Sequence, residues 1–250
     1  MRPFILFILA VSSQIAFSQT PTPTPTPEDV VIQAAKVQNA KATQLNEFIT
    51  KYNTAAQAKD WAAAADAVKQ LISLDPTAEY WIALGSMELN AGKYDDSIDA
   101  YKTGLQLAGY PANVKTADAK TRTLMANALT NTGNAYVKTK NLGEATKYYG
   151  QAADLDPNPG LAYFNLCAVQ YNAGNMEAAV EACSKSIAAD PTRADAYFIK
   201  GSSLYGNGKI DANGKYVLPA GTVEALKKYL ELAPNGPHAE DVKAMLEAAK

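Results

Sequence analysis

The sequence predicts an all-α fold built from repeated helix-turn-helix units, and three observations lead to this prediction. The features of residues 126–157 (ANALTNTGNAYVKTKNLGEATKYYGQAADLDP) recur in residues 160–191. In both copies a first helical run reaches a polar break, and a second run ends at Asp-Pro. Proline has no N–H and disfavours helix in the residue before it, so each second helix should end there. A third copy begins at Ala194.

The period of about 34 residues, the helix pairing and six positions of the first full copy resemble the tetratricopeptide repeat family. The six residues are Gly133, Tyr136, Ala145, Tyr149, Ala152 and Pro157. The resemblance implies an α-α superhelix of about five repeats. Members of this family mostly act as scaffolds that bind proteins. The resemblance therefore implies a protein or peptide as the partner.

Residues 1–27 should form two segments that precede the repeats. Residues 1–18 combine a basic start, the apolar run Phe4–Val11 and a small-x-small motif before Gln19, which is the pattern of a secretory signal peptide. The run is shorter than the roughly 20 apolar residues that span a membrane, so no span is expected after cleavage. Residues 19–27 hold four Thr-Pro dipeptides and should form an extended linker. We expect an exported protein, periplasmic or secreted.

Two interpretations of the linker remain open. It can be a passive tether between the leader and the repeats. It can also be a glycosylated or wall-attached stalk, by analogy with other segments rich in threonine and proline.

The repeat domain should cover residues 28–250. The predicted repeats are 45–77, 78–111, 126–159, 160–193 and 194–234. In the first repeat Tyr52 stands where later copies have glycine, and its opening helix has no breaker between Glu28 and Ala58. We expect this long helix to cap the open end of the stack, as terminal repeats require.

Two insertions and a final helix complete the chain. Residues 112–125 separate the second repeat from the third, and there Pro111 and a helix-compatible run from Val114 predict a lengthened first helix for the third repeat. Asn213-Gly214, between two apolar runs, predicts a small β-hairpin near residues 209–219. Residues 238–249 form an amphipathic pattern typical of a C-terminal capping helix.

The composition argues against nucleic-acid binding and catalysis. The formal net charge is −2, without a cluster of basic residues that could neutralise phosphates. The single histidine, His238, begins the last predicted helix, and the chain has no HExxH motif, phosphate-binding loop or nucleophile elbow. Two cysteines with one histidine do not make a zinc site. We therefore expect no enzyme activity, no cofactor and no metal.

The two cysteines predict a disulfide bond. Cys167 takes the small-residue position on the first helix of its repeat, and Cys183 takes the position of Tyr149 on the second helix. The two fall at a similar height in an antiparallel helix pair, and the leader implies an oxidising compartment. The alternative is a pair of small buried thiols that pack like alanine.

The family resemblance also predicts a binding groove. In the family, first-helix side chains that do not face their own second helix line the concave side of the superhelix. In this sequence the main groove residues are Asn90, Asn134, Lys138, Phe164, Tyr171, Asn172, Phe198 and Tyr205. The same rule also places Ile82 and Ser202 there. Some members hold a peptide carboxylate with a Lys and Asn pair; Asn134 matches the asparagine, but Thr130 stands in place of the lysine.

The four rings of this groove decide between possible functions. Phe164 with Tyr171, and Phe198 with Tyr205, have the same spacing and lie one period apart, which predicts one patch. Exposed rings beside amides suit an extended peptide or a short helix. A carbohydrate-binding or envelope-anchoring module could use the same patch. The remaining alternative is that the hairpin or the last helix covers the rings as ordinary core.

Overall fold

The computed structural model describes residues 26–212 and 216–249, and it confirms the predicted all-α repeat fold. The predicted leader, almost all of the Thr-Pro linker and the Asn213-Gly214 turn lie outside the described residues. Within the described part, no helix is both long and apolar enough to cross a membrane. By its internal contacts the chain divides into two units, residues 1–43 and 44–250, which are described separately below.

The first helix, α1, extends from Pro27 to Gln57 and therefore begins in the first unit and ends in the second. In the first unit, every side chain described from Thr26 to Thr43 is exposed. In the second unit, Ala55 and Ala56 near the end of α1 pack against the apolar cluster that includes Ala64 of α2 (Trp61–Leu74). Tyr52 of α1, which replaces the expected glycine, packs against the apolar cluster around Val68 of α2.

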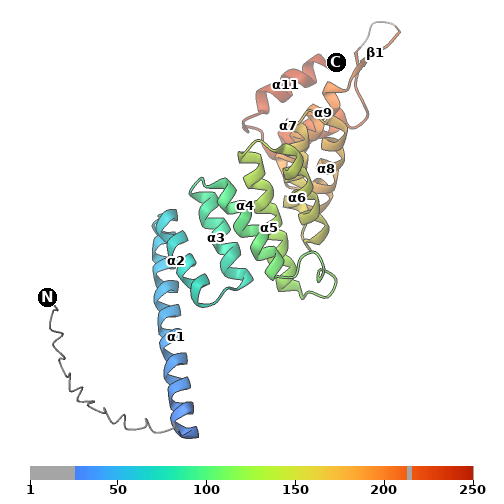
Figure 1. The fold of residues 1–250 in the computed structure, drawn as a ribbon. Coiled ribbons are helices and arrows are strands. Elements are labelled where there is room, and N and C mark those ends of the chain that lie inside the picture. Colours follow the sequence, from blue (N-terminus) through green and yellow to red (C-terminus); the bar gives the residue numbers. More distant parts are fainter. Residues whose placement is uncertain (1–25, 213–215, 250) are drawn as a thin grey trace, which may run out of the picture. The chain divides into compact units, whose positions relative to one another are not determined.

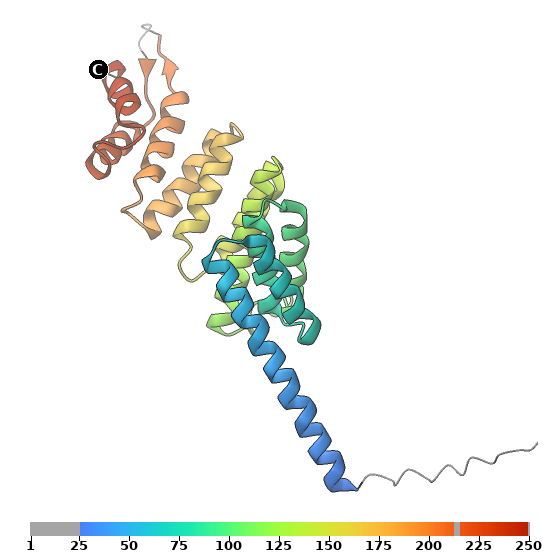
Figure 2. The same ribbon diagram turned by 90° about the vertical axis from the view of Figure 1, so that its left-hand side faces the viewer.

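The rest of the second unit is a row of helix pairs that lie side by side in chain order (Figures 1 and 2). The pairs are α3 (Ala78–Asn90) with α4 (Tyr94–Leu107), α5 (Ala119–Lys138) with α6 (Leu142–Leu155), α7 (Gly160–Asn172) with α8 (Met176–Ala189), and α9 (Ala194–Gly206) with α10 (Thr222–Leu232). The last helix, α11 (Ala239–Ala248), packs on α10 and buries Val242, as predicted for a cap.

The helices end where the Asp-Pro pairs predicted. Helices α2, α6 and α8 stop immediately before Asp75, Asp156 and Asp190. The turns within the pairs need a left-handed residue, which is Gly92 in one repeat and Gly174 in another. Glycine adopts this conformation without a steric penalty, so these turns keep the two helices close.

A close approach of the two helices recurs at the same position of successive repeats. A Cβ atom added to Gly133 would lie 2.6 Å from the Tyr149 ring, and one added to Gly85 would lie 2.8 Å from the Tyr101 ring. The missing side chain thus makes room for a tyrosine ring. Both tyrosines are almost fully buried, at 0% and 3% exposure for Tyr101 and Tyr149. This contact fixes the spacing of the helices that carry the candidate site.

The lengthened first helix of the third repeat is only partly confirmed. Helix α5 begins at Ala119, before the period resumes at Ala126, but the preceding residues 108–118 form turns rather than helix. Asp118 explains the start, because its side chain accepts a hydrogen bond from the backbone N–H of Thr121 at 2.7 Å. The prediction of helix from Pro111 to Asp118 was therefore wrong.

The predicted hairpin is present as two short antiparallel strands. Strand β1 (Lys209–Ile210) pairs with β2 (Tyr216–Val217), with Lys209 opposite Val217 and Ile210 opposite Tyr216. It lies between α9 and α10 in the chain, and Figure 1 labels its first strand. The Tyr216 hydroxyl donates a hydrogen bond to the backbone carbonyl of Tyr205, which ties the hairpin to the end of α9.

Candidate functional site

A chain of polar side chains connects the second and third repeats. The hydroxyls of Ser86 on α3 and Tyr101 on α4 lie 2.9 Å apart, and the Asn131 side chain on α5 acts on the Tyr101 hydroxyl to lower its pKa. Asn134 Nδ2 donates to Asn131 Oδ1 at 3.1 Å, and the Tyr149 hydroxyl of α6 donates to Asn134 Oδ1 at 2.7 Å. The two amides are therefore held in place from both sides.

The two tyrosines of this chain are strongly perturbed. Burial raises the pKa of Tyr101 to about 12, although its hydrogen bonds with Ser86 and Asn131 act in the opposite direction. Burial alone raises the pKa of Tyr149 to about 12. Removing a buried phenol from water disfavours its charged form. Both hydroxyls should therefore remain protonated in the folded protein well above the pH at which an exposed tyrosine ionises.

We expect stability to fall between pH 9 and pH 11. The unfolded chain releases these phenolic protons near pH 10 while the folded chain retains them, so each tyrosine should cost about 1.3 kcal/mol over this interval. Urea unfolding at the two pH values measures the loss. The Tyr149→Phe variant lacks one of the two phenols. Its loss of stability over this interval should therefore be about 1.3 kcal/mol smaller than that of the wild type. An identical pH dependence in both proteins would contradict the assignment.

Two of the four predicted groove rings contact the residue that precedes the helix after next, which is α9 for Phe164 and α11 for Phe198. The Arg193 guanidinium, just before α9, lies 5.2 Å from the centre of the Phe164 ring. His238, just before α11, stacks on Phe198 with ring centres 3.8 Å apart and planes 1° apart. The phenylalanine at the same position of two successive repeats thus has one face covered by a side chain from further along the chain. These contacts were not predicted from the sequence.

The other two rings differ from each other. Tyr205 lies edge-on to Tyr216 of the hairpin, with ring centres 5.7 Å apart. Tyr171 is half-buried and packs at the edge of the cluster around Cys167 and Cys183. Part of the predicted aromatic patch is thus packed against other elements, as the core alternative anticipated for Phe198 and Tyr205. Within the described residues, no other aromatic ring stacks on or packs edge-on to Tyr171.

Three predicted polar residues occupy the same position in their repeats and are exposed. Asn90, Lys138 and Asn172 are the last residues of α3, α5 and α7. Asn134 lies one turn before Lys138 on α5 and is half-buried. These side chains mark one side of the first helices in successive repeats.

Two residues placed in the groove by the family rule do not belong to an open surface. Ile82 is 7% exposed, and a Cβ added to Gly104 of α4 would lie 2.6 Å from its side chain, so Ile82 faces its own second helix. Ser202 is 8% exposed and its hydroxyl lies 4.0 Å from the sulfur of Met245 on α11. Both predictions were wrong, because contacts with other helices bury these side chains.

Two further asparagines were not predicted from the sequence. Asn131 and Asn165 hold the same position in the third and fourth repeats, one period apart, and both are half-buried. That spacing was a signal that could have found them. Together with Asn134 and Asn172 they form a set that we call the amide row.

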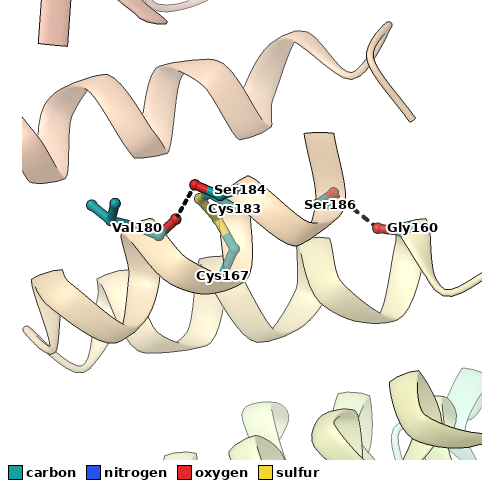
Figure 3. Close-up of a disulfide and its surroundings, with 6 residues drawn as sticks. All are labelled: Gly160, Cys167, Val180, Cys183, Ser184 and Ser186. Atoms are coloured by element: carbon teal, nitrogen blue, oxygen red, sulfur yellow. Dashed lines mark hydrogen bonds between the residues drawn. A yellow bond between two sulfur atoms is a disulfide. The ribbon is translucent and has the colours of Figure 1, made fainter. Parts of the chain in front are cut away.

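The cysteine pair joins α7, which carries Asn165 and Asn172, to α8. Cys167 of α7 and Cys183 of α8 are joined by a disulfide, with Cα atoms 5.0 Å apart, and both side chains are fully buried (Figure 3). The Ser186 hydroxyl further along α8 donates to the carbonyl of Gly160 at 2.9 Å (Figure 3). These two links connect α7 to α8 at separate heights and hold the helix that carries Asn165 and Asn172.

Comparisons with known proteins agree with the repeat fold. The tetratricopeptide repeat family model matches residues 51–113 and 130–194. The structure is similar to that of MamA (TM-score 0.60, 22% identity, covering 80% of this chain and 96% of that chain), and to MamA 41-end from Desulfovibrio magneticus RS-1 (0.61, 15%, 78% and 97%). It is also similar to YrrB, described as a tetratricopeptide repeat protein with an unusual peptide-binding site (0.56, 18%, 79% and 90%). A sequence search of curated proteins found no significant match.

Proposed function

This chain belongs to the tetratricopeptide repeat family, and on that premise we propose that it is a non-catalytic scaffold that binds a protein or peptide segment. The ligand would lie along the first helices α5 and α7, in contact with the amide row. Lys138 and Tyr171 would flank it. The observation that carries this proposal is the fixed orientation of the Asn131 and Asn134 amides.

Oriented amides suit a peptide main chain because an amide both donates and accepts hydrogen bonds, as a peptide group does. A side chain that is already held loses less conformational entropy when a ligand binds. Tyr149 holds Asn134, and Asn134 holds Asn131. Both amides are therefore already ordered in the folded protein before a ligand binds. The peptide-binding site named for YrrB supports the same class of ligand, although at 18% identity the likeness itself extends only to the fold.

Peptides selected from a displayed library of random dodecapeptides provide the test. We expect Asn134→Ala and Asn172→Ala each to weaken a selected peptide about five- to tenfold, since a lost hydrogen bond costs roughly 1–1.5 kcal/mol. Fluorescence anisotropy measures the affinity. Asn235→Ala is the matched control, because Asn235 is exposed in the turn before α11. Equal affinity in all four proteins would place the site elsewhere.

The carbohydrate-binding or envelope-anchoring alternative has less support. Stacking on a sugar requires rings with a free face. His238 occupies one face of Phe198, and Tyr205 packs on Tyr216 of the hairpin. The ring pattern that suggested a glycan site therefore offers fewer free ring faces in the folded protein.

We also propose that the protein is exported, to the periplasm or beyond the cell. The leader pattern in residues 1–18 and the disulfide between Cys167 and Cys183 support this location, since disulfides persist in oxidising compartments.

A further inference from the structure

The N-terminal part of α1 has an apolar surface that no described residue of its own unit covers. Val30, Val31, Ile32 and Val37 are 56%, 68%, 45% and 67% exposed. A helix without tertiary packing is marginally stable in water, since most helical stability in proteins comes from burial of one face. The segment Pro27–Thr43, called the N-terminal segment below, therefore has the features of a helix that binds something.

The second unit has an open apolar cleft at its first helix pair. The cleft has a volume of about 780 Å³ and lies between the C-terminal part of α1 and α2. It is lined mainly by small and apolar side chains, with charged groups among them: Phe48, Thr50, Lys51, Thr54, Ala55, Ala58, Asp60, Ala63, Asp66, Ala67 and Gln70. In a repeat array each pair normally covers the side of its neighbour, and within the described residues no repeat precedes this pair.

The lysines of the N-terminal segment can pair with the aspartates of the cleft. The cleft carries Asp60 and Asp66, whereas Lys51 is paired with Glu47 at 2.7 Å. The N-terminal segment carries Glu28 and Asp29 at its start and Lys36 and Lys41 further along. Its lysine-bearing part thus matches an alanine-rich cleft with two aspartates.

One wall of the cleft is formed by Thr54 and Ala55 near the C-terminal end of α1 and by Ala58 just after it. We propose that the N-terminal segment of one copy docks in the α1–α2 cleft of a second copy, and that the exchange is reciprocal in a two-fold dimer. Such a contact is isologous, so one pair of surfaces is used twice.

This dimer leaves the amide row open, because the cleft residues lie on α1 and α2 and the amide row lies on α5 and α7. A dimer would therefore present two peptide sites. A peptide or partner that carries two copies of the recognised segment would gain avidity from it.

The test is sedimentation equilibrium of the purified full chain across a range of concentrations. We expect a monomer–dimer equilibrium. Val31→Asp with Val37→Asp should weaken the dimer at least about tenfold, and so should Ala63→Glu in the cleft. Ala63 is exposed, and circular dichroism checks that each variant keeps its helices. Val217→Asp on strand β2, at 48% exposure, is the matched control and should leave the dimer intact.

Exchanging charged residues between the two surfaces tests whether the lysines of the N-terminal segment face Asp66 in the dimer. Lys36→Glu with Lys41→Glu should weaken the dimer, and Asp66→Lys added to these should recover part of the affinity. A monomer at every concentration would overturn the proposal. A dimer that the valine variants break but Ala63→Glu leaves intact would also overturn it, because the N-terminal segments would then pair with each other. Binding to anionic phospholipid vesicles that requires the two valines, with a monomeric chain, would identify a membrane as the occupant instead.

Discussion

Replacing Gly133 with alanine should destabilise the protein by roughly 2 kcal/mol, although alanine is the better helix former. The new methyl group would lie 2.6 Å from the Tyr149 ring, closer than any real carbon contact allows. The ring cannot withdraw easily, because it is 3% exposed and its hydroxyl holds Asn134. The helices must separate or the ring must leave its rotamer. Urea unfolding followed by circular dichroism measures the change.

Gly150 provides the matched control in the next helix. A Cβ added there meets no atom within 4 Å, so Gly150→Ala removes backbone freedom without a clash. It should stabilise the protein by about 0.5–1 kcal/mol. The same chemical change should thus have opposite signs at two helical glycines. If Gly133→Ala were also stabilising, the close contact between α5 and α6 would be refuted.

Removal of the disulfide should have the other large effect. The double variant Cys167→Ala, Cys183→Ala should lose about 3 kcal/mol of stability, since the bond closes a loop with a sequence separation of 16. Helix α7 should be affected most, because the bond joins its centre to α8 (Figure 3). Unfolding in the absence of reductant measures the loss.

Reductant serves as the control for this variant. It should lower the stability of the wild-type protein to about that of the double variant and leave the double variant unchanged. A thiol titration of the unfolded, unreduced wild-type protein gives an independent result. Two reactive thiols would show that the cysteines are reduced in the native protein, and the expected loss would then disappear.

Local chemistry in the sequence predicted the ends of three second helices, α2, α6 and α8. Proline after Asp75, Asp156 and Asp190 stops the second helices because it disfavours helix in the residue before it. The start of α5 was not predicted correctly, since a helix-compatible run does not reveal its own boundary. The Asp118 side chain sets that boundary by accepting the Thr121 N–H.

The candidate site could be predicted only in part. The period identified the first-helix positions of Asn134, Lys138 and Asn172. It could not show that His238 would stack on Phe198, which is more than a full period away in the chain, or that Arg193 would cover Phe164. These rings matched the spacing of a binding patch, but the same spacing also fits rings packed between repeats.

The sequence by itself determined the repeat, its period and the pairing of helices, because these follow from local preferences for helix, turn and stop. Tertiary structure alone decided which groove positions remain open, since that depends on side chains from neighbouring helices. It also decided that Ser86 bonds to Tyr101 and that Tyr149, Asn134 and Asn131 form a hydrogen-bonded chain. Hydrogen bonds form only at short distances, and only the packing of neighbouring helices brings these polar groups within reach of one another.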